Sequence, residues 1–532
     1  MNILRACVLA IAATTPAIAE DDGATRSSST TTITILHTND IHGRHAPFQA
    51  APGDATSQTG DPGRSPAQFD HAGKVGGFQY LAGKVGEIRK REGKDNVLLL
   101  DAGDTFSDDF VGNKTRGEAV ISLMNALGYD MMALGNHDFD YGVERTRELQ
   151  ELANFPIRGA NVTENGEPVF GQPWRIFEVD GVKIAVLALT YHSTDKTASA
   201  QNIRGLTYSS GIEATQRYLP EMRRAADIVM LLSHQGTATD RKLARELDGV
   251  DVIVGGHSHD LFRQPERVGG TWIVQAMADA AVLGELRLDV GPDKKLRRVT
   301  GAAHQLWNYQ IEPDPEIAEL VARIDGPFGD ELNEVLAYSV DRIPRDYRSE
   351  SAFDKMVGEF MIEETGADVA LMPGVGYGIS IYPGEVTRDR LYTLIPHPAK
   401  LVTFEMRGRD LLAVLEQSAT NQNPGDPMQI VGGLIQPANL GWTVDLNRPK
   451  GDRVSEVTVG NQPIEADRWY KVATNAGMSN GLHRYDFTGV RNKQVHDRSV
   501  TQLVEDVMKR KRVLSRPASG STRLVKVFDP KN

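Results

Sequence analysis

Cysteine is almost absent from this sequence. Its 532 residues contain one cysteine, Cys7, close to the N-terminus. A single thiol cannot form an intramolecular disulfide, and removal of the N-terminal segment would leave no thiolate in the mature chain. We therefore expect any metal site to use carboxylate, imidazole or amide groups.

Long apolar runs are also missing, because a membrane-spanning helix needs ~20 such residues. The short apolar stretch Ala6–Ala13 follows Arg5 and precedes Ala17–Ala19, a small-x-small pattern. This arrangement predicts a signal peptide over residues 1–19, cleaved after Ala19, and a periplasmic or secreted protein with no membrane span. Residues 20–32 are polar and are predicted to form a flexible lead-in.

Basic residues are too few for a general nucleic-acid-binding surface. The chain has 59 Lys and Arg against 71 Asp and Glu, a net charge of −12. This balance argues against a nucleic-acid polymer as a partner and leaves small molecules as the expected substrates. The length exceeds what one hydrophobic core supports, so two domains are predicted.

Apolar runs of strand length alternate with helical patterns through the first half of the chain. Helices are predicted from Gly76-Gly77-Phe78 onward and over Gly117–Leu127, and strands are predicted at segments such as Met131–Leu134 and Ile184–Leu189. This alternation is typical of an α/β domain whose sheet is covered on both faces. Residues 45–71 are rich in Pro, Gly, Asp and Ser and are predicted to be a surface insertion.

Polar side chains with metal-binding chemistry follow the predicted strands, and the richest segment is Gly135–Gly142. Sites in α/β folds lie at the carboxyl ends of strands, so we expect these residues to converge. The candidate metal ligands are Asp40, His42, Asp104, Asn136, His234, His257 and His259. Six other histidines are expected to be solvated or packed, namely His37, His45, His71, His192, His304 and His483.

The candidate ligands suit two divalent ions such as Zn, Mn, Fe(II) or Ca. Asp104 is the expected bridge, being the only carboxylate at its strand end. A water between two such ions becomes hydroxide near neutral pH and can attack phosphorus. His137 is expected to assist this reaction, oriented by Asp140 or, as the competing choice, by Asp138.

The second half of the chain reads as a helical linker and another domain. A helix is predicted that starts at Pro313-Asp314-Pro315-Glu316 and runs through Ile324, within a linker spanning residues 306–335. The predicted domains are residues 33–305 and 336–528. The second shows helical and strand patterns but no dense cluster of possible ligands.

These motifs resemble the calcineurin-like metallophosphoesterases, through Asp40-x-His42, Gly103-Asp104, Gly135-Asn136-His137-Asp138, His234 and Gly256-His257-Ser258-His259. The longer forms His37–Gly43 and Gly135–Gly142 resemble the exported 5′-nucleotidase branch, which includes cyclic-nucleotide phosphodiesterases. The resemblance implies a four-layer α/β/β/α first domain and a smaller α+β substrate-binding domain. It also implies one metal held by Asp40, His42, Asp104 and His259, a second held by Asp104, Asn136, His234 and His257, and a catalytic His137–Asp140 pair.

Two departures affect the expected substrate pocket. The family's phosphate-binding arginine is missing from Met372–Gly378, and its two base-stacking phenylalanines are missing from Ile395–Pro398 and Thr474–Gly477. His397 is the candidate to stack in their place. A basic run before Phe353 is the candidate phosphate contact, formed by Arg342, Arg345 and Arg348.

The sequence therefore predicts an exported two-metal phosphoester hydrolase, with nucleotides among the candidate substrates. Two alternatives stay open. The second domain also resembles thiosulfohydrolases, through Val431–Leu434 and Tyr470–Ala473 among other segments, which would imply release of sulfate from a sulfur carrier. The other alternative is a catalytically silent periplasmic binding protein.

Overall fold

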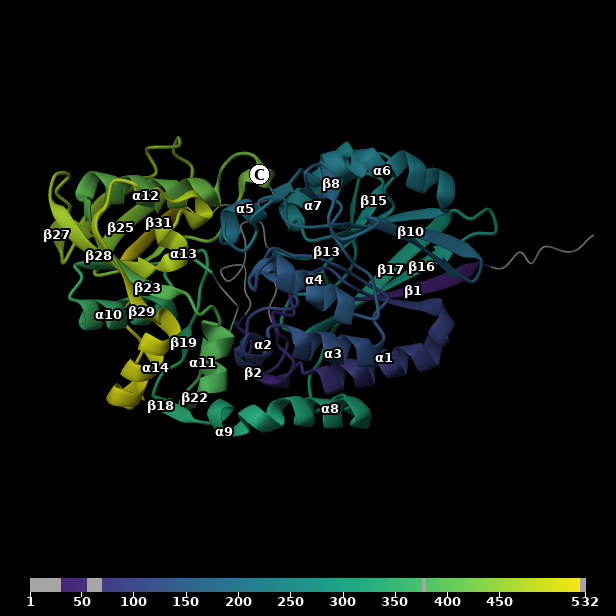
Figure 1. Cartoon of the computed structure of the whole chain (residues 1–532), viewed down its shortest axis with the longest axis horizontal. Helices are drawn as coiled ribbons and strands as arrows, with labels where there is room; N and C mark the ends of the chain where they lie inside the picture. The colour runs from purple at the N-terminus through teal and green to yellow at the C-terminus, as the bar shows by residue number, and fades with distance from the viewer. Residues whose placement is uncertain (1–29, 55–68, 376–378, 527–532) are drawn as a thin grey trace, which may run out of the picture.

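The computed structural model describes residues 30–54, 69–375 and 379–526, which form two lobes (Figure 1). The predicted signal peptide and most of the predicted lead-in lie outside the described residues. Strand β1 (Thr31–Thr38) already begins within the last part of that lead-in. Among the helices of the described ranges, none has the length and apolarity needed to cross a membrane.

Two six-stranded sheets form the centre of the first lobe. The strand order of one sheet is β17-β16-β1-β4-β5-β6, with β4 (Val97–Asp101), β5 (Met131–Ala133), β6 (Ile157–Arg158), β16 (Val282–Val290) and β17 (Leu296–Gln305). The strand order of the other is β14-β15-β13-β12-β10-β9, with β9 (Trp174–Val179), β10 (Val182–Leu189), β12 (Ile228–Ser233), β13 (Val252–Gly255), β14 (Glu266–Val268) and β15 (Thr271–Val274). Strands β1, β4, β5 and β6 run parallel, as do β10, β12, β13 and β15, so each set ends at one edge of its sheet.

The two sheets pack face to face. Ile35 and Leu100 of the first sheet share a fully buried cluster with Val186 and Met230 of the second. Helices cover the outer faces: α1 (Phe78–Glu92) and α3 (Glu118–Leu127) on the first sheet, α6 (Gly211–Ala225) and α7 (Thr237–Glu246) on the second. The predicted four-layer α/β/β/α arrangement is confirmed.

The predicted linker helix is α8 (Pro315–Asp325). Its first turn is capped by Asp314, whose carboxylate accepts the backbone N–H groups of Glu316 and Ile317, each at 3.0 Å. Helix α8 packs on α1 and α3, and the chain reaches the second lobe after α9 (Gly329–Leu332). The domain boundaries given above stay predictions.

The second lobe is α+β, as predicted. Its five-stranded sheet has the order β24-β20-β28-β23-β29, with β20 (Val369–Met372), β23 (Lys400–Arg407), β24 (Gln436–Ala438), β28 (Trp469–Asn475) and β29 (Arg491–Ser499). A smaller sheet contains β25 (Leu440–Asp445) and β26 (Val454–Val459). The main helices are α10 (Ala352–Thr365), α11 (Arg388–Leu394), α12 (Gly408–Gln422) and α14 (Val500–Lys511).

The described ends of the predicted 45–71 insertion lie at the junction between the lobes. Strand β2 (Phe48–Ala50) contributes Phe48 and Ala50 to a buried cluster that includes residues of the second lobe. Asp54 is 1% exposed and accepts hydrogen bonds from Arg342 and Ser380, each at 2.6 Å. The prediction of a surface insertion is therefore wrong for these ends, because apolar and charged side chains here find partners across the junction. Residues 55–68 lie outside the described part of the chain.

Candidate active site

All seven predicted ligands follow strands of the two packed sheets. Asp40 and His42 follow β1, Asp104 follows β4 and Asn136 follows β5. His234 follows β12, and His257 and His259 follow β13. The parallel strands direct their carboxyl ends to one side of the sandwich, which brings these loops together.

One group of side chains consists of Asp40, His42 and His259, whose ligand atoms lie within 4.8 Å of one another. Asp40 Oδ1 lies 3.2 Å from His259 Nε2, and the Nε2 atoms of His42 and His259 are also 3.2 Å apart. A carboxylate and two imidazoles that converge at this spacing form a suitable half-shell for a divalent ion.

A second group consists of Asp104, His234 and His257, with ligand atoms again within 4.8 Å. Asp104 Oδ2 lies 3.0 Å from His234 Nε2, and His234 Nδ1 donates a hydrogen bond to the Ala102 carbonyl at 2.7 Å. That hydrogen bond fixes the ring so that Nε2 faces the group. Asp40 Oδ1 is 3.8 Å from the same Nε2, so the two groups adjoin.

The buried amide of Asn136 tests whether these residues suit a metal. Asn136 is 2% exposed, and its Oδ1 atom has no hydrogen-bond partner among the described residues. A buried carbonyl oxygen without a partner is unfavourable, and a bound cation would satisfy it. Together with the carboxylate and imidazole donors on either side, this oxygen fits divalent ions.

The ligand loops hold a strained backbone. Positive φ angles, which L-residues rarely adopt, occur at Asp40 (52°), His42 (53°), Asp104 (56°), His257 (74°) and His259 (53°). Such conformations cost energy and persist where the surrounding structure enforces them, commonly at functional sites. The close packing continues at Gly135, where an added Cβ would lie 2.1 Å from Asp104 Oδ1.

The charges of the two groups act on each other. Burial opposes protonation of His234, but the carboxylates of Asp104 and Asp40 outweigh it and raise its pKa to about 9. Burial and then the nearby charge of His234 hold the pKa of His257 well below its ordinary value. The site is thus a dense arrangement of carboxylates and imidazoles that shift one another's pKa values.

His137 lies next to the first group, with its ring centroid 5.5 Å from that of His42. Its Nδ1 atom is 2.8 Å from Asp140 Oδ2. Asp138 is turned the other way and accepts backbone N–H groups of Asp104, Thr105, Phe106 and Gly135 at 2.7–2.9 Å. The structure therefore places Asp140, and not Asp138, beside the imidazole.

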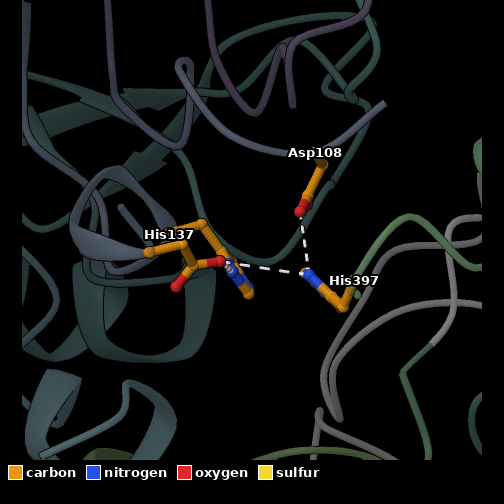
Figure 2. Close-up of side chains that lie close together, drawn as sticks. Asp108, His137 and His397 are labelled. Atoms are coloured by element: carbon orange, nitrogen blue, oxygen red, sulfur yellow. Dashed lines mark hydrogen bonds and ion pairs between the residues drawn. The ribbon is translucent and has the colours of Figure 1, made fainter. Parts of the chain in front are cut away.

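A third cluster was not foreseen in full. Asp108, His137, Asp140 and His397 bring their ligand atoms within 4.8 Å of one another. Figure 2 shows His397, which comes from the second lobe, directed at Asp108 and lying beside His137. Sequence reasoning singled out three of these residues and missed Asp108. Its only signal was the acidic pair Asp108-Asp109, four residues after Gly103-Asp104.

The three arginines proposed as phosphate contacts lie in other surroundings. Arg345 is 3% exposed and forms an ion pair with the buried carboxylate of Asp354 at 3.0 Å. Arg342 pairs with Asp54 at the lobe junction, and Arg348 is 5% exposed. Arg342 and Arg345 are thus engaged with carboxylates of the chain itself, and the role of the three arginines as phosphate contacts stays a prediction. Of the loop in which that arginine is missing, residues 376–378 lie outside the described ranges.

The other side of the site is also covered by the second lobe. Tyr191 stacks on His257, with ring centroids 3.9 Å apart, and donates a hydrogen bond to the Ile430 carbonyl at 2.9 Å. His192, which was set aside above, donates from Nε2 to the Met428 carbonyl at 2.7 Å. Neither residue lies in a motif that marks it as part of the site.

Comparison with known proteins decides the family. Residues 33–261 match the model of the calcineurin-like phosphoesterases, and residues 333–489 match that of the 5′-nucleotidase C-terminal domain. The chain belongs to the two-domain 5′-nucleotidase family of calcineurin-like phosphoesterases. It is accordingly a phosphoester hydrolase, and the alternative of a silent binding protein is not retained.

This phosphoesterase has relatives in bacteria and animals. It is 27% identical to 5′-nucleotidase of Bos taurus over 84% of this chain and 83% of that protein. It is 26% identical to the trifunctional nucleotide phosphoesterase protein YfkN of Bacillus subtilis over 85% of this chain, but it spans only 32% of that protein.

Two solved structures share the fold of the phosphoesterase. The 5′-nucleotidase precursor of Thermus thermophilus has a TM-score of 0.82 and 26% identity, covering 93% of this chain and 99% of that one. The sulfate thiohydrolase SoxB of Thermus thermophilus has a TM-score of 0.85 and 24% identity, covering 94% and 98%. The family uses divalent metals, and the groups described above offer the side chains to hold them.

Proposed function

We propose that the chain is an exported hydrolase of small-molecule phosphoesters, nucleotides among them, that works with two divalent ions. The observation that carries this proposal is the pair of adjoining ligand groups, Asp40-His42-His259 and Asp104-His234-His257, with the buried Asn136 amide beside them. Ions bound there would lower the pKa of water and absorb charge on the phosphoryl oxygens. The relatives named as 5′-nucleotidase and nucleotide phosphoesterase support the substrate class.

Within this proposal the chain's own residues have separate tasks. His137 donates a hydrogen bond from Nε2 to an oxygen of the phosphoester, and Asp140, 2.8 Å from its Nδ1, orients the ring. Asp138 holds the backbone of the Asp104 and Asn136 loops in place through four N–H groups. The second lobe covers the side of the site that faces it and thereby excludes water.

The test is hydrolysis by the purified mature chain with added Mn, Zn or Ca. The panel consists of AMP, UDP-glucose, 2′,3′-cyclic AMP, bis-p-nitrophenyl phosphate and a thiosulfonate. We expect turnover of at least one phosphoester, no turnover after metal removal, and a ~10²- to 10⁴-fold loss of kcat in His137→Ala with unchanged metal content. A metal-loaded chain that hydrolyses no phosphoester on the panel would contradict the proposal.

A thiosulfohydrolase-like activity is the second candidate, because the fold likeness to the sulfate thiohydrolase extends over 94% of the chain. Turnover of the thiosulfonate without turnover of any phosphoester would favour it.

Export is tested separately by intact-mass analysis of the native protein. We expect the mature N-terminus at Glu20.

A further inference from the structure

The second lobe places an imidazole against the catalytic candidate of the first. His397 lies in the loop between α11 and β23, and its ring stacks on His137 with centroids 4.9 Å apart and an interplanar angle of 14°. Its Nδ1 atom is 2.8 Å from Asp108 Oδ1 and 3.9 Å from Asp140 Oδ2. One face of the His397 ring, the candidate to stack on a substrate, is therefore covered by His137 in this structure.

Asp108 joins this imidazole to the first metal group. One carboxylate oxygen faces His397, and the other lies 3.0 Å from Nδ1 of His42, whose Nε2 points toward His259. Asp108 is 2% exposed, and both it and Asp109 have positive φ angles, 80° and 54°. Two consecutive strained residues are costly and survive only where their surroundings enforce them. The loop is thus shaped to hold this carboxylate between two imidazoles.

The backbone of the His397 loop is fastened on both sides. Asn113 of the first lobe donates a hydrogen bond to the Pro396 carbonyl at 2.9 Å. Thr501, at the start of α14, donates to the carbonyls of Ile395 and His397, each at 3.2 Å. Hydrogen bonds from both lobes therefore fix the backbone that carries His397, and Asp108 of the first lobe contacts its ring.

We propose that His397 is a second hydrogen-bond donor of the active site, brought to the substrate when the lobes pack together, and that Asp108 is the positioning residue that orients it. In its doubly protonated form the ring donates Nδ1–H to Asp108 and still carries a proton on Nε2, which is directed away from that carboxylate. The Nε2–H donates to the leaving-group oxygen and stabilises the negative charge that develops as the P–O bond breaks. The inference rests on the proposed phosphoester hydrolysis and extends it to substrates with poor, alkoxide-like leaving groups, which need this stabilisation most.

The experiment compares a good and a poor leaving group. Wild type, His397→Phe and Asp108→Asn are assayed with p-nitrophenyl phosphate and phenyl phosphate in the full-length mature chain with added Mn. His397→Phe keeps a ring that can stack on His137 and removes the donor. We expect it to lower kcat for phenyl phosphate at least ~10-fold more than for p-nitrophenyl phosphate, with Asp108→Asn changing the ratio in the same direction.

The matched control is His304→Phe. His304 also pairs with a carboxylate, Glu285, at 2.8 Å and is 24% exposed, close to the 30% of His397. We expect this variant to leave both rates and their ratio unchanged. Metal content and thermal midpoint are measured for every variant. His397→Gln is the second variant, for use if His397→Phe folds poorly. Its side-chain amide is a smaller hydrogen-bond donor, so we expect the ratio of the two kcat values to lie between those of wild type and His397→Phe.

Equal losses on the two substrates, or no loss, would overturn the role of His397 while leaving the proposed hydrolysis intact. A wild-type chain that turns over neither substrate nor any other phosphoester would overturn both. If the ratio of kcat for the two substrates changes in His397→Phe but not in metal-replete Asp108→Asn, His397 is supported as a donor and Asp108 is not its positioning residue.

Discussion

The ring of His37 lies in β1, three residues before Asp40, and is 2% exposed. Burial lowers its pKa to about 3 from the ordinary 6.5. The imidazole is therefore neutral in the folded chain at neutral pH, and it packs against the neighbouring strand β16 instead of facing the metal groups. Its contribution to the molecule is packing, as its place in the strand before Asp40 predicts.

This burial predicts a pH dependence of stability. The unfolded chain binds a proton at His37 below pH 6.5, whereas in the folded chain His37 stays neutral until the pH falls to about 3. The stabilising contribution is thus complete above pH 6.5 and is lost as the pH falls toward 3, at about 1.4 kcal/mol per pH unit. We expect the free energy of unfolding of wild type to fall more steeply between pH 6.5 and 4.5 than that of His37→Gln, both measured in denaturant with chelator present. Parallel pH profiles would contradict the assignment.

Asp138 and Asp140 show that the sequence predicts a carboxylate beside His137 but not which of the two it is. Both follow Asn136 in a loop where a carboxylate was expected to orient His137, and the residue types alone allowed either. Burial, followed by the charge of Asp104, raises the pKa of Asp138 to about 6, while Asp140 remains 27% exposed beside His137. The choice depends on the turn of the short helix His137–Phe139, which directs the two side chains apart. Spacing predicts the loop but not that turn.

Strands and the loops after them carry most of what the sequence predicted about this site. Apolar runs such as Met131–Leu134 determine where β5 ends, and a polar residue just after the run must then lie at the sheet edge. Asp108 was missed because its position comes from two consecutive positive φ angles in a loop, which residue types other than glycine do not announce. The Phe48–Asp54 segment was misjudged because its partners lie in the second lobe.

The pairing of β1 with β16 places His37 opposite Gly284 and makes this glycine a packing requirement. An added Cβ at Gly284 would lie 2.0 Å from His37 Nε2, and neither the buried ring nor the strand has room to move. We expect Gly284→Ala to destabilise the chain by about 1–3 kcal/mol, measured by denaturant unfolding. Addition of His37→Ala should recover part of this loss, because it removes the ring that the new methyl group meets.

Gly86 provides the control for this substitution. It lies within α1, and an added Cβ there meets no atom within 4 Å. Gly86→Ala should be neutral or stabilise the chain by up to about 1 kcal/mol, because alanine favours the helix. A similar loss of stability in both variants would show that the clash with His37 is not the cause.

At the scale of the whole molecule, the two lobes meet through a shared apolar cluster and through polar contacts between residues far apart in the sequence. His397 reaches His137 and Asp108 only because α11 and the loop after it lie against α2 (Phe110–Thr115), as Figure 1 shows. The sequence marked His397 as a substitution at a stacking position, yet its stacking partner proved to be His137. How lobes pack depends on the shape and charge of complete surfaces, so the second half of the site was beyond reach from motifs alone.

Arg44 anchors this junction. It follows the first ligand loop, is 2% exposed, and forms a two-pronged hydrogen bond to Asp389 of α11 at 2.8 and 3.2 Å. Asp109 approaches the same guanidinium at 3.3 Å. A buried charge held by partners from both lobes links the metal loops to the second lobe.

Removal of one partner should therefore weaken the whole molecule. Asp389→Ala leaves the Arg44 guanidinium buried with only Asp109 beside it, and truncation of one member of such a pair typically costs about 2–5 kcal/mol. We expect a lower thermal midpoint in calorimetry and faster proteolysis at the junction. The control is Lys242→Ala, which removes another ion pair between the lobes, to Asp426 at 3.2 Å, whose side chains are 26% and 42% exposed. Exposed pairs contribute about 0–1 kcal/mol, so Lys242→Ala should behave almost as wild type. Equal, small effects in the two variants would mean that the Arg44 pair does not hold the lobes together.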